Sequence, residues 1–301
     1  MPLITLFSAP KSFSDPHIAV IQRNAILSWT HLGADVETLL VGDEPGMQAV
    51  AEEYGVRQLP EIRRNASGTP LVSSIFEQAR SASQSLLLVY INADVMLLPS
   101  FVDAARLVSQ QLSEFLLIGQ RWDLNVRQVL DFSTGWEQRL QADLRQRGHL
   151  HLPAGSDYFV FPRALFSEMP DFAIGRAGWD NWMIYHARQR GWAVVDGTPS
   201  ITVIHQDHDY RHLPGGLPHY EQPESRQNEA LAGGTANLYM VLDSDKQLIA
   251  GKVRPPRWSW MRALRRIEIS LTPPDGSRSG LRWSLARRAR RLRRRLTGSL
   301  Q

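Results

Sequence analysis

The chain has 301 residues, and its 34 Lys and Arg residues against 30 Asp and Glu residues give a net charge of +4. It has no cysteine, which excludes disulfide frameworks, thiolate metal sites and cysteine nucleophiles. The charge is divided unevenly, because residues 1–251 carry a net −9 and residues 252–301 a net +13. This division disfavours a uniformly basic nucleic-acid-binding protein and favours an acidic body with a basic extension that seeks an anionic surface.

Short apolar segments alternate with amphipathic ones through residues 3–119. Leu3 to Phe7 is the first apolar, partly β-branched segment, and Asp15 followed by Pro16 marks the start of a helix. We predict strands over residues 3–7, 36–41, 56–59, 85–91 and 115–119, and helices over 16–32, 47–54 and 71–82. This alternation predicts an open α/β sheet, in which ligands bind beyond the carboxyl ends of the strands.

The pattern is less regular after Gly119. It predicts helices over 131–148 and 179–190, strands over 158–161, 193–195 and 201–204, and a long loop over the His-, Pro- and Gly-rich residues 207–235. We divide the chain into a globular domain, 1–250, and a basic amphipathic tail, 251–301, that is helical or disordered. No apolar run reaches about 18 residues and the start lacks the features of a secretory signal, so we expect a cytoplasmic protein.

Polar residues directly follow the most apolar predicted strand. Asn92 and Asp94 are separated by one residue, so in an extended segment their side chains point the same way. Their oxygens are ligands that suit Mg²⁺ or Mn²⁺, and such an ion can bridge a diphosphate. Alternatively, Asp94 caps the following helix.

A second polar cluster begins where the last predicted strand stops. His205 or His208 could complete a coordination shell begun by Asp94, and imidazole beside carboxylate favours Mn²⁺, although Mg²⁺ also fits. Alternatively, these histidines are exposed side chains of a hydrogen-bonded loop.

A segment rich in Gly and Trp opens the helix predicted over 179–190. Asp180 could serve there as the general base for an acceptor hydroxyl, or as the N-cap of the helix. Side chains expected to bind an acceptor gather on the same rim of the sheet: Arg121, Trp122, Asp157, Trp179 and Trp182.

Several motifs are absent. The sequence has no G-x-G-x-x-G after the first strand, no G-x-x-x-x-G-K-[ST], no G-x-S-x-G and no H-E-x-x-H. Dinucleotide-dependent redox enzymes, P-loop NTPases, ordinary α/β-hydrolases and zinc peptidases are therefore disfavoured.

The order of these motifs over residues 3–210 resembles that of GT-A glycosyltransferases, the nucleotide-diphospho-sugar transferase superfamily, especially family 2-like members. The resemblance rests on Asn92-Ala93-Asp94 at the end of a central strand, Gly178-Trp179-Asp180 at a helix start, and His205 at the end of a later strand. It implies an α/β fold in which helices flank a Rossmann-like, mixed but mainly parallel sheet.

The resemblance also implies roles for individual residues. Asp94 would hold the metal of a sugar-nucleotide diphosphate, joined by His205 or His208, and Asp180 would activate the acceptor. The positions of Ser8 to Lys11 and of Asp43 match those that usually hold the nucleoside, which places Ser8, Lys11, Asp43, Asn92 and Asp94 at the donor. Two departures from the family pattern are Asn92, which replaces the first acid of D-x-D, and the lack of a Glu-Asp pair beside Asp180.

We therefore predict a metal-dependent glycosyltransferase that transfers a sugar from a nucleotide-diphosphate donor to a glycan or lipid-linked acceptor, with inversion. One alternative is a metal-dependent phosphoesterase centred on His205, Asp207, His208 and Asp209. Another is a noncatalytic sugar-nucleotide-binding module tethered by its tail.

The basic tail itself has three interpretations. Its Trp and Arg residues suit the headgroup boundary of an anionic membrane, which would place the protein peripherally at the inner face. Alternatively, residues 258–269 pack on the body as a final helix and only the terminal arm is exposed, or the arginines contact RNA.

Overall fold

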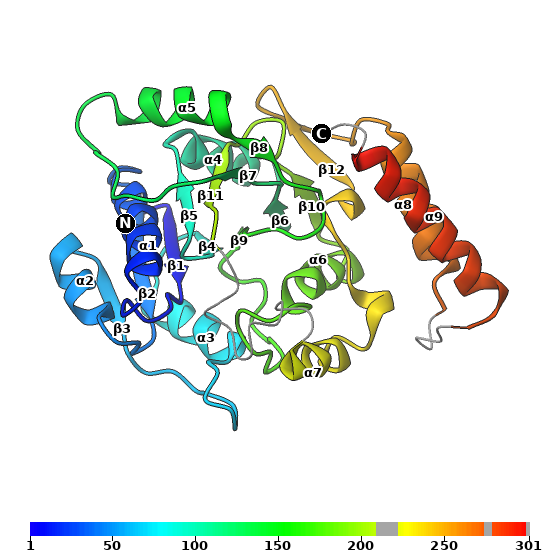
Figure 1. Cartoon of the computed structure of the whole chain (residues 1–301), viewed down its shortest axis with the longest axis horizontal. Helices are drawn as coiled ribbons and strands as arrows, with labels where there is room; N and C mark the ends of the chain where they lie inside the picture. Colours follow the sequence, from blue (N-terminus) through cyan, green and yellow to red (C-terminus); the bar gives the residue numbers. More distant parts are fainter. Residues whose placement is uncertain (209–221, 274–278, 299–301) are drawn as a thin grey trace.

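The computed structural model describes residues 1–208, 222–273 and 279–298, which form two β-sheets flanked by helices (Figure 1). Within these residues the larger sheet has nine strands, and the pairs made by β9 and β13 are antiparallel while the others are parallel. In sheet order the strands are β13 (Lys252–Arg254), β12 (Lys246–Ile249), β10 (Ala193–Asp196), β6 (Phe115–Ile118), β9 (Tyr158–Pro162), β4 (Leu87–Ile91), β1 (Ile4–Ser8), β2 (Val36–Val41) and β3 (Arg57–Leu59).

Helices cover both faces of this sheet, because alternate strand residues point to opposite sides. Leu6 and Val89 pack in one core with α1 (Pro16–Thr30), α2 (Met47–Tyr54) and α4 (Ser100–Gln111). Phe7 and Leu88 pack in the other core with α3 (Val72–Ala82) and α6 (Trp179–Gln189). The predicted α/β class and mainly parallel sheet are confirmed.

The start of α1 shows how local sequence positions an element. The side chain of Asp15 accepts hydrogen bonds from the backbone N–H groups of His17 and Ile18, and Pro16 occupies the first turn. This is the cap that the sequence predicts, and it fixes the entry of a helix that lines one side of the cleft described below.

A second, smaller sheet is the main feature that the sequence did not indicate. It is formed by β5 (Val95–Leu97), β11 (Val203–Gln206), β7 (Trp122–Leu124) and β8 (His149–Leu150), in that order. The strand expected over 201–204 is thus present as β11, shifted by two residues and paired outside the main sheet. The other three strands have only two or three residues each, too few to show an alternating pattern.

Three expectations for the helices need correction. Helix α4 was not predicted, and α5 (Trp136–Arg147) starts five residues later than the predicted 131, because Gly135, with φ of 83°, precedes its first turn. Helix α7 (Pro223–Leu231) lies within the segment expected to be a loop, 207–235. The part of that loop over residues 209–221 lies outside the described residues.

The predicted boundary between residues 250 and 251 falls between β12 and β13, which pair with each other in the larger sheet. The segment 258–269 is largely α8 (Trp260–Leu271), and it packs on the body through buried polar contacts. Arg262 donates from Nη2 to Asp196 Oδ2 at 2.7 Å and from Nη1 to the carbonyl oxygens of Leu242 and Ser244.

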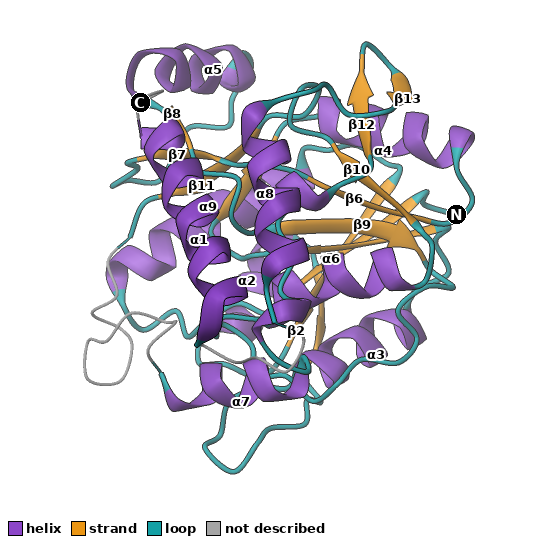
Figure 2. Cartoon of the chain, turned by 90° about the vertical axis from the view of Figure 1, so that its right-hand side faces the viewer, coloured by secondary structure: helices purple, strands orange, loops and turns teal. Residues whose placement is uncertain are grey.

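Helix α9 (Gly280–Gly298) lies antiparallel beside α8 (Figure 2), and the two helices lie at the opposite end of the molecule from α2 (Figure 1). Within the part of the chain that the structure describes, no helix is both long enough and apolar enough to cross a membrane.

We expect Arg262→Ala to lower the free energy of unfolding by about 3–5 kcal/mol, because it leaves the buried carboxylate of Asp196 without its ion-pair partner. Urea denaturation followed by circular dichroism measures this change. The control is Arg266→Ala, which removes an exposed arginine of the same helix and should alter stability by less than about 0.5 kcal/mol. Equal effects of the two substitutions would show that α8 does not depend on this ion pair.

Candidate functional site

A cleft of about 1210 Å³ opens beyond the carboxyl ends of β1 and β4. Its walls come from the loop after β1, the residues that follow β4, the loop before β9, the start of α6, and facing side chains of α8 and α9. This is the edge at which an open α/β sheet binds ligands. The cleft therefore lies where the sequence predicted it.

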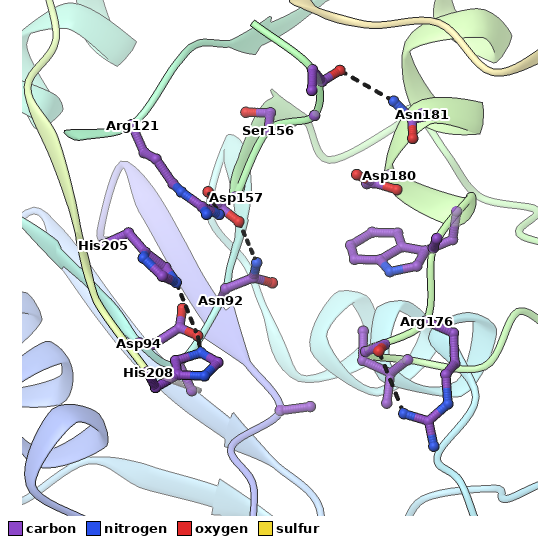
Figure 3. A pocket seen from close by; sticks show the side chains of 18 of the residues that line it. Asn92, Asp94, Arg121, Ser156, Asp157, Arg176, Asp180, Asn181, His205 and His208 are labelled. Carbon is purple, nitrogen blue, oxygen red and sulfur yellow. Dashed lines mark hydrogen bonds and ion pairs between the residues drawn. The ribbon is translucent and has the colours of Figure 1, made fainter. Parts of the chain in front are cut away.

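One side of the cleft holds three potential metal ligands, Asp94, His205 and His208 (Figure 3). Oδ2 of Asp94 lies 3.0 Å from Nε2 of His208 and 3.7 Å from Nε2 of His205. The three ligand atoms lie within 4.8 Å of one another. The residues that the sequence assigned to a metal therefore come together.

The electrostatics of this group suit a divalent cation. Burial opposes ionisation of Asp94, but the charges of His205 and His208, together with Lys11, outweigh it and hold the pKa of Asp94 below its ordinary value. Its second oxygen, Oδ1, is buried and has no hydrogen-bond partner among the described residues. A cation would satisfy that oxygen, and one carboxylate with two imidazoles is a donor set that Mn²⁺ accepts.

The small sheet explains how His205 reaches Asp94. In its register, His205 lies opposite Val95 on one neighbouring strand and opposite Asp123 on the other. Its Nδ1 atom lies 3.2 Å from Oδ1 of Asp123, while its Nε2 atom faces Asp94. A carboxylate on one ring nitrogen fixes the orientation of a histidine whose other nitrogen binds metal. Nδ1 of His205 is within ion-pair distance of Asp123 but forms no hydrogen bond among the described residues, so Asp123 positions the ring through its charge.

A second group, Asp123, His205 and Asp207, also has spacing compatible with a metal. Here, however, Asp123 already accepts a hydrogen bond from Nε of Arg121 at 2.8 Å and lies 2.6 Å from Nδ1 of His151. The permanent positive charge of Arg121 repels a cation at this position. We therefore assign the metal to the Asp94 group. The predicted phosphoesterase centre includes Asp209, which lies outside the described residues.

Asn92 contacts a neighbouring carboxylate instead of the metal group. Its Nδ2 group donates to Asp157 Oδ1 at 2.7 Å, and its Oδ1 atom accepts from the hydroxyl of Tyr90. The other oxygen of Asp157 accepts from Arg121 at 2.8 Å. Asn92, Asp157 and Arg121 thus form a connected polar floor between the two sides of the cleft. An aspartate at position 92 would place a second negative charge against Asp157, which accounts for the departure from D-x-D.

Asp180 lies on the opposite side of the cleft (Figure 3). It is the second residue of α6, and its Oδ1 accepts from the backbone N–H of Gly178 at 3.3 Å. Gly178, with φ of 111°, holds the N-cap position, so Asp180 is not the cap. Desolvation by the cleft wall, reinforced by the charge of Asp157, raises the pKa of Asp180 to about 6. A carboxylate with such a pKa is suited to accept a proton near neutral pH.

Close packing holds Asp180 in place. A Cβ atom at Gly155 would lie 2.6 Å from Oδ2 of Asp180, so a side chain at position 155 would displace this carboxylate. The ring of Trp179 packs edge-on against Tyr90 with their centroids 5.0 Å apart, which anchors the start of α6 to β4.

Four predicted site residues do not line the cleft. Ser8 is fully buried in β1, and Asp43 pairs with Arg64 over a separate shallow hollow. Trp122 packs in a small core under α5, and Trp182 is buried with its ring stacked on His186. The tryptophan assignments were wrong because spacing alone does not show which face of an element is covered. Lys11, Asn92, Arg121, Asp157 and Trp179 do line the cleft.

The structure adds cleft residues that the sequence did not single out. Arg176 lines the cleft and forms an ion pair at 2.7 Å with Glu224, which joins the loop before α6 to α7. Arginines of α8 and α9 form another part of the wall. The sequence identified these arginines as part of a basic tail. Nothing in the sequence pattern indicated that this tail reaches the cleft.

Comparison with known proteins shows the fold. No protein-family model and no curated protein sequence matches the chain. The structure of S. aureus TarS 1–349 in complex with UDP-GlcNAc is similar with a TM-score of 0.52 at 13% identity, covering 81% of this chain and 68% of that one. Glucosyl-3-phosphoglycerate synthase from Mycobacterium tuberculosis, in complex with Mn²⁺, UDP and phosphoglyceric acid, covers 85% of this chain and 87% of its own at 17% identity, with a TM-score of 0.47.

The likeness to TarS confirms the GT-A fold that the motif order implied. The Asp94 group, whose spacing is compatible with a metal ion, and Asp180 line one cleft of this fold.

We expect Asp94→Asn to weaken Mn²⁺ binding at least about 100-fold, because removing even an outer partner of a metal ligand costs about 10–100-fold. Isothermal titration calorimetry with MnCl₂ measures the affinity, and circular dichroism checks the fold. The control is Asp207→Asn, which belongs only to the second group and should retain most of the affinity. The assignment fails if the Asp207 variant loses Mn²⁺ and the Asp94 variant keeps it.

Proposed function

We propose that this chain is a metal-dependent glycosyltransferase that moves a sugar from a nucleotide-diphosphate donor to a glycan or lipid-linked acceptor. One observation carries the proposal: a metal-ligand group and a carboxylate of raised pKa, Asp180, face the same cleft from opposite sides. In such a cleft, a metal on one side can neutralise the charge of a leaving group, and the carboxylate on the other side can deprotonate the attacking hydroxyl.

The donor belongs on the side of Asp94. Bound there, Mn²⁺ or Mg²⁺ would neutralise charge on the departing diphosphate. Asp94, His205 and His208 would hold the ion, and Lys11, which lines the same wall, adds a positive charge for the phosphates. Gln22 of α1 fixes the backbone of Lys11 through hydrogen bonds to its N–H and carbonyl groups, at 2.6 and 2.9 Å.

The acceptor belongs on the side of Asp180. The carboxylate of Asp180 would take the proton of an acceptor hydroxyl. The hydroxyl oxygen would then bond to the anomeric carbon of the donor sugar, while the bond between that carbon and the diphosphate breaks. The products are the glycosylated acceptor and a nucleoside diphosphate. Attack from the face opposite the leaving group inverts the anomeric centre, and the position of Asp180 across the cleft supports that outcome.

The shared fold lends support, because TarS carries UDP-GlcNAc in its structure. The main competitor is a phosphoesterase at the His205 group, which would release inorganic phosphate and would have no use for Asp180. A noncatalytic binding module would bind the donor without releasing nucleoside diphosphate.

We expect Asp180→Asn to lower turnover by about 10²–10⁴, the usual range for loss of general acid–base catalysis, with donor affinity nearly unchanged. The assay measures nucleoside diphosphate and inorganic phosphate released from a panel of sugar nucleotides with Mn²⁺ and mixed acceptors. Because a pKa of about 6 makes Asp180 a competent base only above that pH, wild-type turnover should fall as pH drops below 6.

Stability separates this catalytic role from a purely structural one. Folding raises the pKa of Asp180 from its ordinary 3.8 to about 6. The ionised carboxylate therefore lowers the free energy of unfolding as the pH rises above 3.8, and does so fully above pH 6. Asp180→Asn should therefore be as stable as wild type at pH 7, or more stable, while losing turnover. Wild-type turnover in this variant, or release of inorganic phosphate alone, would contradict the proposal.

We also propose that α9 holds the protein at an anionic membrane surface on the cytoplasmic side. Four leucines of this helix are exposed and recur at intervals of four, seven and four residues, which places them on one face: Leu281, Leu285, Leu292 and Leu296. Arg288 and Arg295 flank this face by helical geometry. Leucines beside arginines suit the headgroup boundary, where each nearby cation contributes about 1 kcal/mol.

We expect the double variant Leu285→Gln/Leu292→Gln to lose most of its sedimentation with phosphatidylserine vesicles, because two apolar side chains no longer insert. Donor binding should not change. Leu231→Gln, an exposed leucine of α7, serves as the control and should sediment as wild type does. Equal sedimentation of all three proteins would rule out α9 as the membrane contact.

A further inference from the structure

Helices α8 and α9 place four arginines on the wall of the cleft: Arg265, Arg290, Arg293 and Arg294. Three of them, Arg265, Arg290 and Arg293, contact one carboxylate, Glu268, which is only 1% exposed and lies on the same wall. We name these four guanidinium groups the arginine wall. The glycosyl-transfer chemistry described above makes no use of it.

Two buried carboxylates hold three of the four guanidinium groups of the arginine wall in place. Glu268 accepts hydrogen bonds from Arg265, Arg290 and Arg293 at distances of 2.7–3.1 Å. Asp243 is a second partner of Arg265. Within the residues that the structure describes, Arg294 pairs with neither of these two carboxylates.

Two of the four guanidinium groups have donors left over for a ligand. Among the described residues, the side chain of Arg290 has one hydrogen bond, from Nε to Glu268, although a guanidinium carries five N–H donors. Arg294 is exposed on the cleft wall and forms no ion pair within the described part of the chain. Planar guanidinium groups of this kind bind phosphate and carboxylate groups in bidentate fashion.

A chain of hydrogen bonds connects the arginine wall to the acceptor side of the cleft. Asn181, next to Asp180, donates to the carbonyl of Tyr239 at 2.6 Å and accepts from its N–H at 3.2 Å. Arg265 donates to the carbonyl of Leu238, the adjacent residue, at 3.0 Å. Arg265 is therefore linked to the residue beside Asp180, whereas the donor phosphates would lie with Lys11 and Asp94.

We propose that the arginine wall binds an anionic group of the acceptor, a phosphate or carboxylate, and so selects acceptors that carry one close to the hydroxyl that is glycosylated. The assignment of the anion to an acceptor rests on the proposed function. The anion-binding property itself rests only on the arginines. Binding at the wall would orient the acceptor so that its hydroxyl meets Asp180.

The first test uses sulfate as the probe, titrated calorimetrically into the full chain with and without saturating UDP and Mn²⁺. We expect saturable sulfate binding that persists when UDP occupies the donor side. Arg294→Gln should raise the dissociation constant for sulfate about tenfold, and Arg290→Gln/Arg294→Gln should raise it further. The matched control is Arg288→Gln/Arg291→Gln, which removes two exposed arginines of the same helix outside the cleft.

Equal weakening by the control pair would show that sulfate responds to the general charge of α9, and the proposal would be wrong. The absence of saturable sulfate binding to wild type would also overturn it. If UDP fails to bind while sulfate binding depends on Arg294, the proposed donor chemistry fails and the anion site stands.

The second test compares two acceptors that differ by one phosphate, glycerol 3-phosphate and glycerol, with the sugar nucleotide that gives turnover. We expect Arg294→Gln to raise KM for glycerol 3-phosphate about tenfold, with little change in kcat and no change toward glycerol. Equal effects on both acceptors, or a change in kcat alone, would assign Arg294 a structural role. Thermal denaturation of each variant confirms that it is folded.

Discussion

The register between β5 and β11 is the constraint on which the rest of the cleft depends. It places His205 opposite Val95, one residue from Asp94, and so sets an imidazole against a carboxylate at the edge of the larger sheet. Two groups of α1 keep β11 in this register, because the side chain of Asn24 donates to Gln206 and Gln206 donates to the backbone carbonyl of Ile21. A slip of one residue would turn His205 to the other face of the small sheet.

The cleft shifts the pKa values of its two functional carboxylates, Asp94 and Asp180, in opposite directions. Histidines and a lysine surround Asp94 and keep it ionised, whereas Asp180 lies in a desolvating wall with Asp157 as its nearest charged influence. Paired carboxylates whose environments push their pKa values apart take different chemical roles. The permanently charged one suits a cation, and the one that titrates near neutral pH suits proton transfer. Arg121 and Asn92 bind Asp157 between them and limit how strongly its charge reaches either side.

Sequence reasoning found the parts of this arrangement that long, regular elements determine. Asp94 follows a fully apolar strand and Asp180 follows a glycine at a helix start, so their positions on the rim could be predicted. The role of Asp123 was missed because β7 has three residues, too short for any periodic signal, and this role depends on pairing with β11. Trp182 was misassigned because a helix has two faces and only tertiary packing decides which one is buried. The contribution of α8 and α9 to the cleft could not be predicted, since a basic amphipathic pattern does not reveal which surface it packs against.

The distance along the chain between the metal ligands has a consequence for folding. Asp94 and His208 are 114 residues apart, and they can meet only after the larger sheet has formed and β11 has paired with β5. An unfolded chain holds no preformed site, so an ion bound by this group binds only the native state. Its binding raises the free energy of unfolding in proportion to the logarithm of the concentration of free ion. The lifetime of the folded protein would then follow the metal content of its surroundings.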